Sequence, residues 1–178
     1  MKKGLRRMGV IVLAGGFFGS PLRAEPVQRH ISMKVSTDAS VDTKKISGSS
    51  VRSRVQNRQL TIALDNRDKE VVDGVSVKWT IYARTMDGGH LVTVKEGTEK
   101  PKLAALQTTT VKTPVVTFKG TPQHAVTTQK NSGKGKTQAT SKREPATGEE
   151  YYGYAVQVYE GSTLLDEEYS QPSLKNHK

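Results

Sequence analysis

The chain has 178 residues, of which 28 are Lys or Arg and 17 are Asp or Glu, so its formal net charge at pH 7 is +11. It contains no cysteine. This composition excludes disulfide bonds, thiolate metal ligands, cysteine nucleophiles and thiol redox chemistry, and it predicts a core held by side-chain packing alone.

Residues 1–24 have the pattern of a secretory signal peptide. Basic residues at positions 2–7 precede an apolar run at 8–18, and small residues lead to Ala24. This run is shorter than the roughly 20 residues needed to span a bilayer, so we expect cleavage after Ala24 and no membrane insertion of the mature protein. Five basic residues lie in this segment, and the remaining 23 exceed the 17 acidic residues by 6. The sequence predicts export to the periplasm, the outer surface or the medium.

Residues 25–178 have the usual length of one domain, and period-two alternation predicts several half-buried strands in them. The first is ISMKV at 31–35, which a polar loop at 37–50 is expected to follow. QLTIAL at 59–64 is the second strand, and VSVKWTIYAR at 75–84 has the clearest alternation. The even spacing of strands predicts antiparallel pairing with little helix.

The middle of the chain gives weaker signals. HLVTV at 90–94 is another candidate strand, whereas EKPKLAALQ at 99–107 is the best helical candidate, with at most two turns. TTTVKTPVVTF at 108–118 contains Pro114, which cannot donate a hydrogen bond to a sheet. This segment is therefore an edge strand, a bulged strand, or two short strands in different sheets.

YYGYAVQVY at 151–159 is apolar on both faces, which is typical of a central strand. Strict alternation would place Tyr152, Tyr154, Val156 and Val158 on one face and Tyr151, Ala155 and Tyr159 on the other. A turn at 160–162 and a last strand through Leu164 and Leu165 complete a hairpin. Six to eight strands in one domain predict an all-β, antiparallel sandwich.

The strands resemble an immunoglobulin-like or fibronectin-III-like β-sandwich. Trp79 follows Leu64 by fifteen residues, and EYYGYAV at 150–156 is similar to the family pattern of an acidic residue, a small residue, Tyr and Cys at alternate positions. The resemblance implies that Tyr154 is the tyrosine-corner residue, whose hydroxyl bonds to nearby backbone. It also implies that Val156 and Leu64 replace the paired cysteines and that Trp79 anchors the core.

The overall layout is similar to that of small envelope proteins of gut Verrucomicrobia such as Akkermansia. The features that carry this likeness are the signal peptide, the cysteine-free sandwich and the ending GYAVQVYEGSTLLDEEYSQP at 153–172. Some proteins of that kind accompany pilus components. The likeness implies an envelope location and an association with another envelope protein.

The long polar segment at 119–150 lies outside the strand pattern, and its composition predicts a flexible, disordered insertion. An alternative is a loop that binds a polyanion or a carbohydrate. The basic residues that would carry such binding are Lys130, Lys134, Lys136, Lys142 and Arg143. No aromatic residue is interleaved with them for base stacking, so we expect no specific nucleic-acid partner.

No catalytic, cofactor-binding or metal-binding constellation emerges from the sequence. GKT at 135–137 lacks the glycine of a phosphate-binding loop, because Lys130 occupies that position. The four histidines are scattered, and the acidic run at 166–168 alternates between two faces of a strand. We therefore expect a protein that is not an enzyme.

Three tyrosines lie on predicted outward faces, namely Tyr82, Tyr151 and Tyr159. They could form a contact patch, or they could pack on the second face of the sheet under loops. The sequence predicts an exported structural or interaction module of the cell envelope. Its partner would be another envelope or surface protein, such as a pilus component, or a second copy of the chain.

Overall fold

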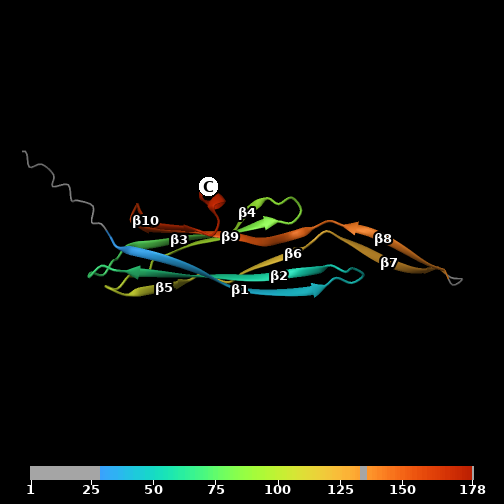
Figure 1. The fold of residues 1–178 in the computed structure, drawn as a ribbon, viewed down its shortest axis with the longest axis horizontal. Coiled ribbons are helices and arrows are strands. Elements are labelled where there is room, and N and C mark those ends of the chain that lie inside the picture. The colour runs from blue at the N-terminus through green and yellow to red at the C-terminus, as the bar shows by residue number, and fades with distance from the viewer. Residues whose placement is uncertain (1–28, 133–135, 178) are drawn as a thin grey trace, which may run out of the picture.

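The computed structural model describes residues 29–132 and 136–177, and this part of the chain forms ten strands and one short helix (Figure 1). The predicted signal peptide lies outside the described residues. The elements are β1 (Ile31–Lys45), β2 (Arg52–Asn66), β3 (Val75–Thr85), β4 (Leu91–Glu99), β5 (Thr108–Lys112), β6 (Val116–Thr121), β7 (His124–Ser132), β8 (Lys136–Glu144), β9 (Thr147–Glu160), β10 (Thr163–Tyr169) and the 3-10 helix η1 (Pro172–Asn176).

The strands form two layers, which confirms the predicted all-β antiparallel sandwich with little helix (Figure 1). One layer contains β1, β2 and the pair β5 and β6, and the other has the order β4-β3-β9-β10. β6 joins the layers through a short pairing with the start of β9. In immunoglobulin nomenclature, this order places strands A, B and E opposite strands G, F and C, with β4 added beside C.

The core lies between the layers, where strands β2, β3 and β9 contribute alternate apolar side chains. Leu60, Ile62 and Leu64 of β2 are fully buried. The opposite wall consists of Val75, Val77, Trp79, Ile81, Tyr154, Val156 and Val158. The four expected core anchors, Leu64, Trp79, Tyr154 and Val156, all belong to this cluster. Their removal from water supplies the main driving force for folding.

β1 is longer than its apolar residues predict. It continues to Lys45 and pairs with β2 throughout, so most of the expected loop at 37–50 is strand. The residues beyond Thr37 are mainly polar and exposed, and they carry no hydrophobic alternation to reveal a strand. The tip of this β1–β2 hairpin lies beyond the core.

Pro114 separates two short strands that pair with the same strand. β5 pairs with 61–65 of β2 and β6 pairs with 54–58. Between them, the Thr113 hydroxyl accepts a hydrogen bond from the Leu60 amide at 3.0 Å, and the Thr113 amide donates to the Leu60 carbonyl at 3.0 Å. The expected helix at 99–107 is absent from this described segment, which contains a bridge between Leu103 and Val72.

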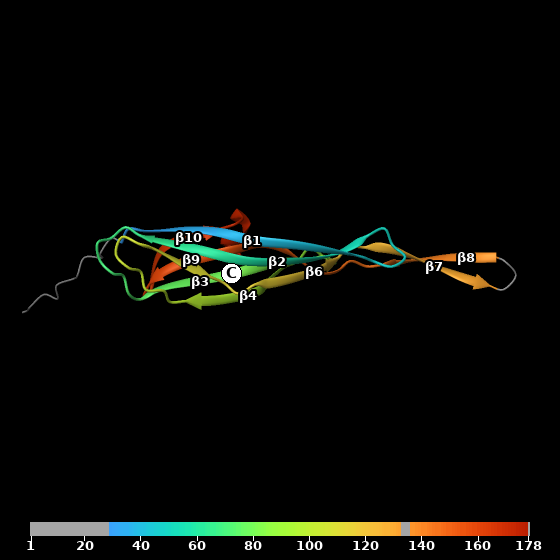
Figure 2. The same cartoon turned by 90° about the horizontal axis from the view of Figure 1, so that it is seen from below.

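The segment at 119–150, expected to be disordered, contains an antiparallel hairpin. His124 pairs with Glu144 at its base, and the register continues to Ser132 and Lys136. We call this β7–β8 hairpin the arm. Figures 1 and 2 show it projecting beyond one end of the sandwich. The arm contains threonine and other short side chains, which adopt a strand conformation without burying either face of the ribbon.

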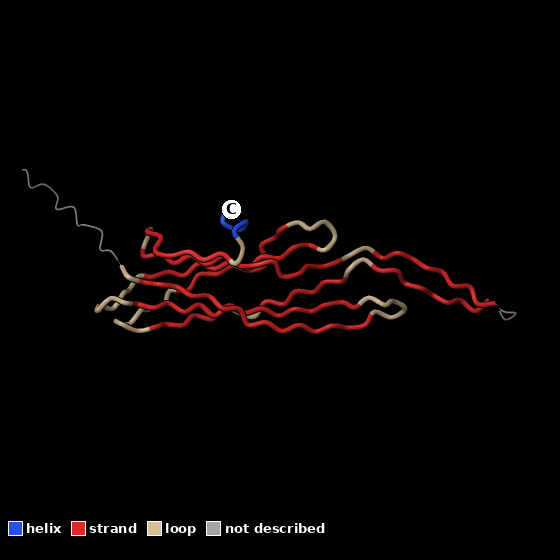
Figure 3. Tube along the Cα trace, in the orientation of Figure 1, coloured by secondary structure: helices blue, strands red, loops and turns tan. Residues whose placement is uncertain are grey.

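The 3-10 helix η1 lies on the outer face of the β4-β3-β9-β10 layer (Figure 3). Its Leu174 side chain is only 1% exposed. Within residues 29–132 and 136–177, no helix has the length and apolar content required to cross a bilayer.

Candidate interaction surfaces

Tyr82 lies on the outer face of β3, as expected, but it is covered. Its side chain is 7% exposed, and its ring packs edge-on against His177 with the centroids 5.6 Å apart. Leu174 lines the same shallow space. The C-terminal segment therefore occupies the surface that Tyr82 would need for contact with a partner.

Tyr151 points inward, which corrects the predicted outward orientation. Its ring packs edge-on against Phe118 at 5.7 Å, and the Arg58 guanidinium lies 5.0 Å from its centroid. The cause is a β-bulge. Tyr82 pairs with Gly153 but Ala83 pairs with Tyr151, so Tyr152 is an extra residue in β9 and the two faces exchange. Burial raises the pKa of Tyr151.

The same bulge places Tyr152 on the outer face. The Arg84 guanidinium lies 4.6 Å from its ring centroid, and its hydroxyl lies 3.0 Å from that of Ser173. Tyr159 is half-buried, with the Lys78 ammonium 4.8 Å from its ring centroid. Tyr82, Tyr151 and Tyr159 therefore do not form one exposed patch.

A chain of polar contacts joins η1 to the outer face of β9 and β10. Lys175 forms an ion pair with Glu167 at 2.7 Å, and the Tyr169 hydroxyl donates to the same carboxylate at 2.9 Å. The Gln157 amide in turn donates to the Tyr169 hydroxyl at 3.1 Å. These contacts orient the C-terminal segment across the sheet, and they depend on an arrangement of elements that the sequence pattern does not reveal.

Two carboxylates of β10 close the edge of β1. Asp166 accepts a hydrogen bond from the Met33 amide at 2.9 Å, and Glu168 accepts one from the Val35 amide at 3.2 Å. The Tyr154 hydroxyl also donates to Glu168, at 2.6 Å, rather than to backbone as the resemblance implies. The signal for this arrangement was available, because residues two apart on a strand share a face.

The basic residues of the predicted polyanion loop lie along the arm. Lys142 and Arg143 are exposed residues of β8, and Lys142 forms an ion pair with Glu144 at 3.0 Å. Lys130 and Lys136 belong to β7 and β8, and Lys134 lies outside the described residues. The described part of this segment is therefore a paired ribbon rather than a flexible loop, and Lys130, Lys136, Lys142 and Arg143 lie on its two strands.

The arm is tied to the tip of the β1–β2 hairpin on one side. The Thr127 amide of β7 donates to the Gly48 carbonyl at 3.2 Å. Thr127 pairs with Ser141, and in an antiparallel ribbon the backbone groups of two paired residues either all point toward the partner strand or all point away from it. Because the Thr127 amide points away from β8, the Ser141 amide points away from β7, toward the outer edge of the arm. In the described part of the chain, β8 pairs with β7 alone.

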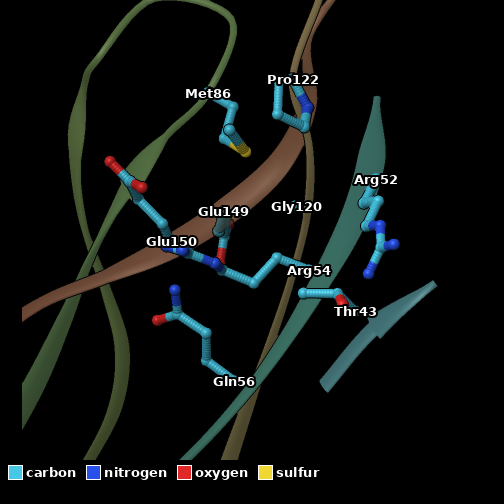
Figure 4. A pocket seen from close by; sticks show the side chains of 9 residues that line it. All are labelled: Thr43, Arg52, Arg54, Gln56, Met86, Gly120, Pro122, Glu149 and Glu150. Carbon is cyan, nitrogen blue, oxygen red and sulfur yellow. The ribbon is translucent and has the colours of Figure 1, made fainter. Parts of the chain in front are cut away.

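A cavity of about 350 Å³ lies where the arm joins the sandwich. Arg52, Arg54 and Gln56 extend into it from β2, and Glu149 and Glu150 line it from β9 (Figure 4). The remaining lining comes from Thr43, Met86, Gly120 and Pro122. The cavity thus combines both signs of charge with a partly apolar surface.

The described residues contain no group of three or more His, Asp or Glu side chains placed to hold a metal ion. Lys136 and Thr137 of the GKT motif lie in strand β8.

No protein-family model, curated protein or solved structure matches the chain. Functional conclusions therefore depend on the surfaces described above.

Proposed function

We propose that the chain is an exported, non-catalytic module of the bacterial cell envelope that acts through protein contact. The arm is the observation that supports this most. A two-stranded ribbon is at best marginally stable alone in water. Most of the arm side chains that the structure describes are exposed, so the arm adds little to the core. A contact role accounts for an element that the sandwich does not need.

The proposed contact is the addition of a partner strand to the outer edge of β8. Free amide and carbonyl groups at a sheet edge are a template for another strand. The other edge of the arm is partly occupied, because Thr127 donates to Gly48. The edge of β1 is also closed near Met33 and Val35 by carboxylates of β10. The Ser141 edge of β8 has no strand paired with it in the described chain, so it is the template that we propose.

The partner would be another envelope or surface protein, such as a pilus component, or a second copy of this chain. Export is supported by the signal-peptide pattern at 1–24 and places the mature protein in the periplasm, on the surface or outside the cell. The backbone contact that we propose is compatible with either partner because main-chain hydrogen bonding depends little on side-chain identity.

A proline substitution tests the contact at β8. Ser141→Pro removes the outward amide, and a proline is tolerated at an edge position that does not donate within the ribbon. We expect this variant to lose about tenfold or more in affinity for envelope proteins retained by the immobilised mature protein, or for its own copies in light scattering.

Ser141→Ala is the matched control, since it keeps the amide and should associate like the wild type. Circular dichroism and the thermal midpoint should be similar for both variants. Wild-type association of Ser141→Pro, with the arm still formed, would contradict the proposal.

Polyanion or carbohydrate binding at the same end is a second candidate function. The contact between Gly48 and Thr127 brings the exposed Lys44, Lys45 and Arg52 of the β1–β2 hairpin to the arm that carries Arg143. Cations from two hairpins thus share one end. Retention on heparin should fall with rising salt, and Arg143→Gln should elute earlier than wild type. Absence of retention at low salt would reject this candidate.

A further inference from the structure

The inner face of β2 changes character along its length. Leu60, Ile62 and Leu64 face the core, whereas Gln56, Arg54 and Arg52 continue the same face into the cavity. Inner positions of a sandwich are normally apolar. Arg52 and Arg54 are exposed, so the polar end of this row lies beyond the core and borders the cavity.

Gln56 provides the first evidence of a binding site. Its side chain is buried, with 6% of the residue exposed, and it extends into the cavity (Figure 4). Among the described residues, no protein group forms a hydrogen bond with its amide. Its oxygen and nitrogen are not sealed from water, because in the described chain Trp79 Nε1 is the one buried side-chain polar atom without a partner, so the amide is open to a ligand that enters the cavity.

The charged side chains on two sides of the cavity provide the second piece of evidence for a binding site. Arg52 and Arg54 come from β2, and Glu149 comes from β9. The adjacent Glu150 points to the opposite face of β9, where it pairs in the sheet with Arg84. Arg52, Arg54 and Glu149 take part in no ion pair within 4.0 Å in the described chain. The strands thus hold opposite charges around one cavity without joining them directly.

This arrangement selects by charge. A simple anion meets two arginines but is repelled by the Glu149 carboxylate, and a simple cation meets the reverse. A ligand that carries both charges gains at both walls, so the cavity discriminates against ions of a single sign. Arginine adds geometric selectivity, because its guanidinium binds a carboxylate with two parallel hydrogen bonds.

We propose that the cavity binds a short zwitterionic peptide, with the ligand carboxylate at Arg52 and Arg54 and its ammonium at Glu149. The amide of Gln56 would bond to the peptide group between the two charges. The volume of about 350 Å³ lies at the lower end of the range for small-molecule sites and suits a ligand of two or three residues.

The site is separate from the outer edge of β8 that the proposed function uses. Loss of peptide binding therefore leaves strand addition at Ser141 intact, and Ser141→Pro leaves the cavity intact. The two proposals can fail independently.

Calorimetric titration of the mature protein with trialanine tests the proposal. We expect binding that weakens about tenfold or more when the peptide is N-acetylated, and to a similar extent when it is C-amidated. Arg54→Gln should weaken binding of trialanine and of the acetylated peptide, whereas Glu149→Gln should weaken binding of trialanine and of the amidated peptide.

Arg143→Gln is the matched control, because it removes an exposed cation of β8 outside the cavity, and it should bind like the wild type. Gln56→Leu should lose affinity without lowering the thermal midpoint, which separates a binding role from a structural one. The proposal would be overturned by no heat of binding for trialanine at millimolar concentration. Equal binding of trialanine and its acetylated form, with Glu149→Gln unaffected, would also overturn it by revealing a plain anion site.

Discussion

Trp79 is the single tryptophan of the chain and packs over Gly97, its partner on β4. A Cβ atom at position 97 would lie 2.7 Å from Cε2 of the indole, which is too close for van der Waals contact. Overpacking of this kind costs about 1 to 3 kcal/mol, more than the 0.4 to roughly 1 kcal/mol that replacing glycine can add.

Gly97→Ala should therefore lower the free energy of unfolding by about 1 kcal/mol or more. Urea denaturation followed by tryptophan fluorescence measures this at the site itself. Thr98→Ala, a change at the exposed neighbour, should have little effect. An unchanged midpoint for Gly97→Ala would show that the indole does not lie over β4.

Tyr154 makes stability depend on pH. Burial, followed by the hydrogen bond to Glu168, raises the pKa of Tyr154 above its ordinary value of 10.0. The folded state then holds the phenolic proton more tightly than the unfolded state. This stabilisation is fully present below pH 10 and is lost as the pH rises from there towards the folded-state pKa.

The free energy of unfolding should consequently fall as the pH rises above about 10, and the fall should be smaller for Tyr154→Phe. The free energy of unfolding of Tyr154→Phe should still fall with rising pH, because the pKa values of Tyr151 and Tyr169 are also raised. Urea titrations at several pH values test this. Parallel pH profiles for the wild type and Tyr154→Phe would contradict the role of Tyr154.

At the scale of elements, η1 stabilises the sheet by covering its outer face. Leu174 is 1% exposed, and its Cδ1 atom would lie 2.9 Å from a Cβ atom placed on Gly153. Leu174→Ala should lower the free energy of unfolding by about 2 kcal/mol or more. Thermal or urea unfolding measures the loss, with Asn176→Ala as an exposed control. Equal stability of the two variants would mean that η1 does not pack on the sheet.

Strands with one apolar face and one polar face could be predicted from the sequence. Trp79 and the alternate residues of β3 lie in the core as their spacing indicates. Tyr151 was misplaced because a bulge depends on the pairing between β9 and β3, which a single strand does not encode. The arm was missed because polar residues at 124–144 give no hydrophobic alternation. Its strand conformation follows from pairing.

The cavity could not be predicted from the sequence, because it also depends on how distant strands pair. Arg52 and Arg54 precede the apolar part of β2, and their spacing alone predicts a shared face. Only the pairing of β6 with the start of β9 brings Glu149 opposite them. The charges of such a site are visible in the sequence, but their convergence depends on long-range topology.

For the whole molecule, export is the first step of the proposed function. The signal-peptide pattern predicts removal of residues 1–24, so the exported protein should begin at Glu25. N-terminal sequencing and intact mass measurement of protein recovered outside the cytoplasm test this. An exported form that still begins at Met1 would contradict the predicted cleavage.

Association of the whole molecule through the outer edge of β8 can be tested by site-specific photocrosslinking in the producing cells. A photoreactive amino acid at Ser141, on the outer edge of β8, should give a discrete adduct with a partner protein or a second copy. The same group at Thr98, on the exposed β4, should give none. Adducts at Thr98 alone, or at neither position in correctly exported protein, would contradict the account.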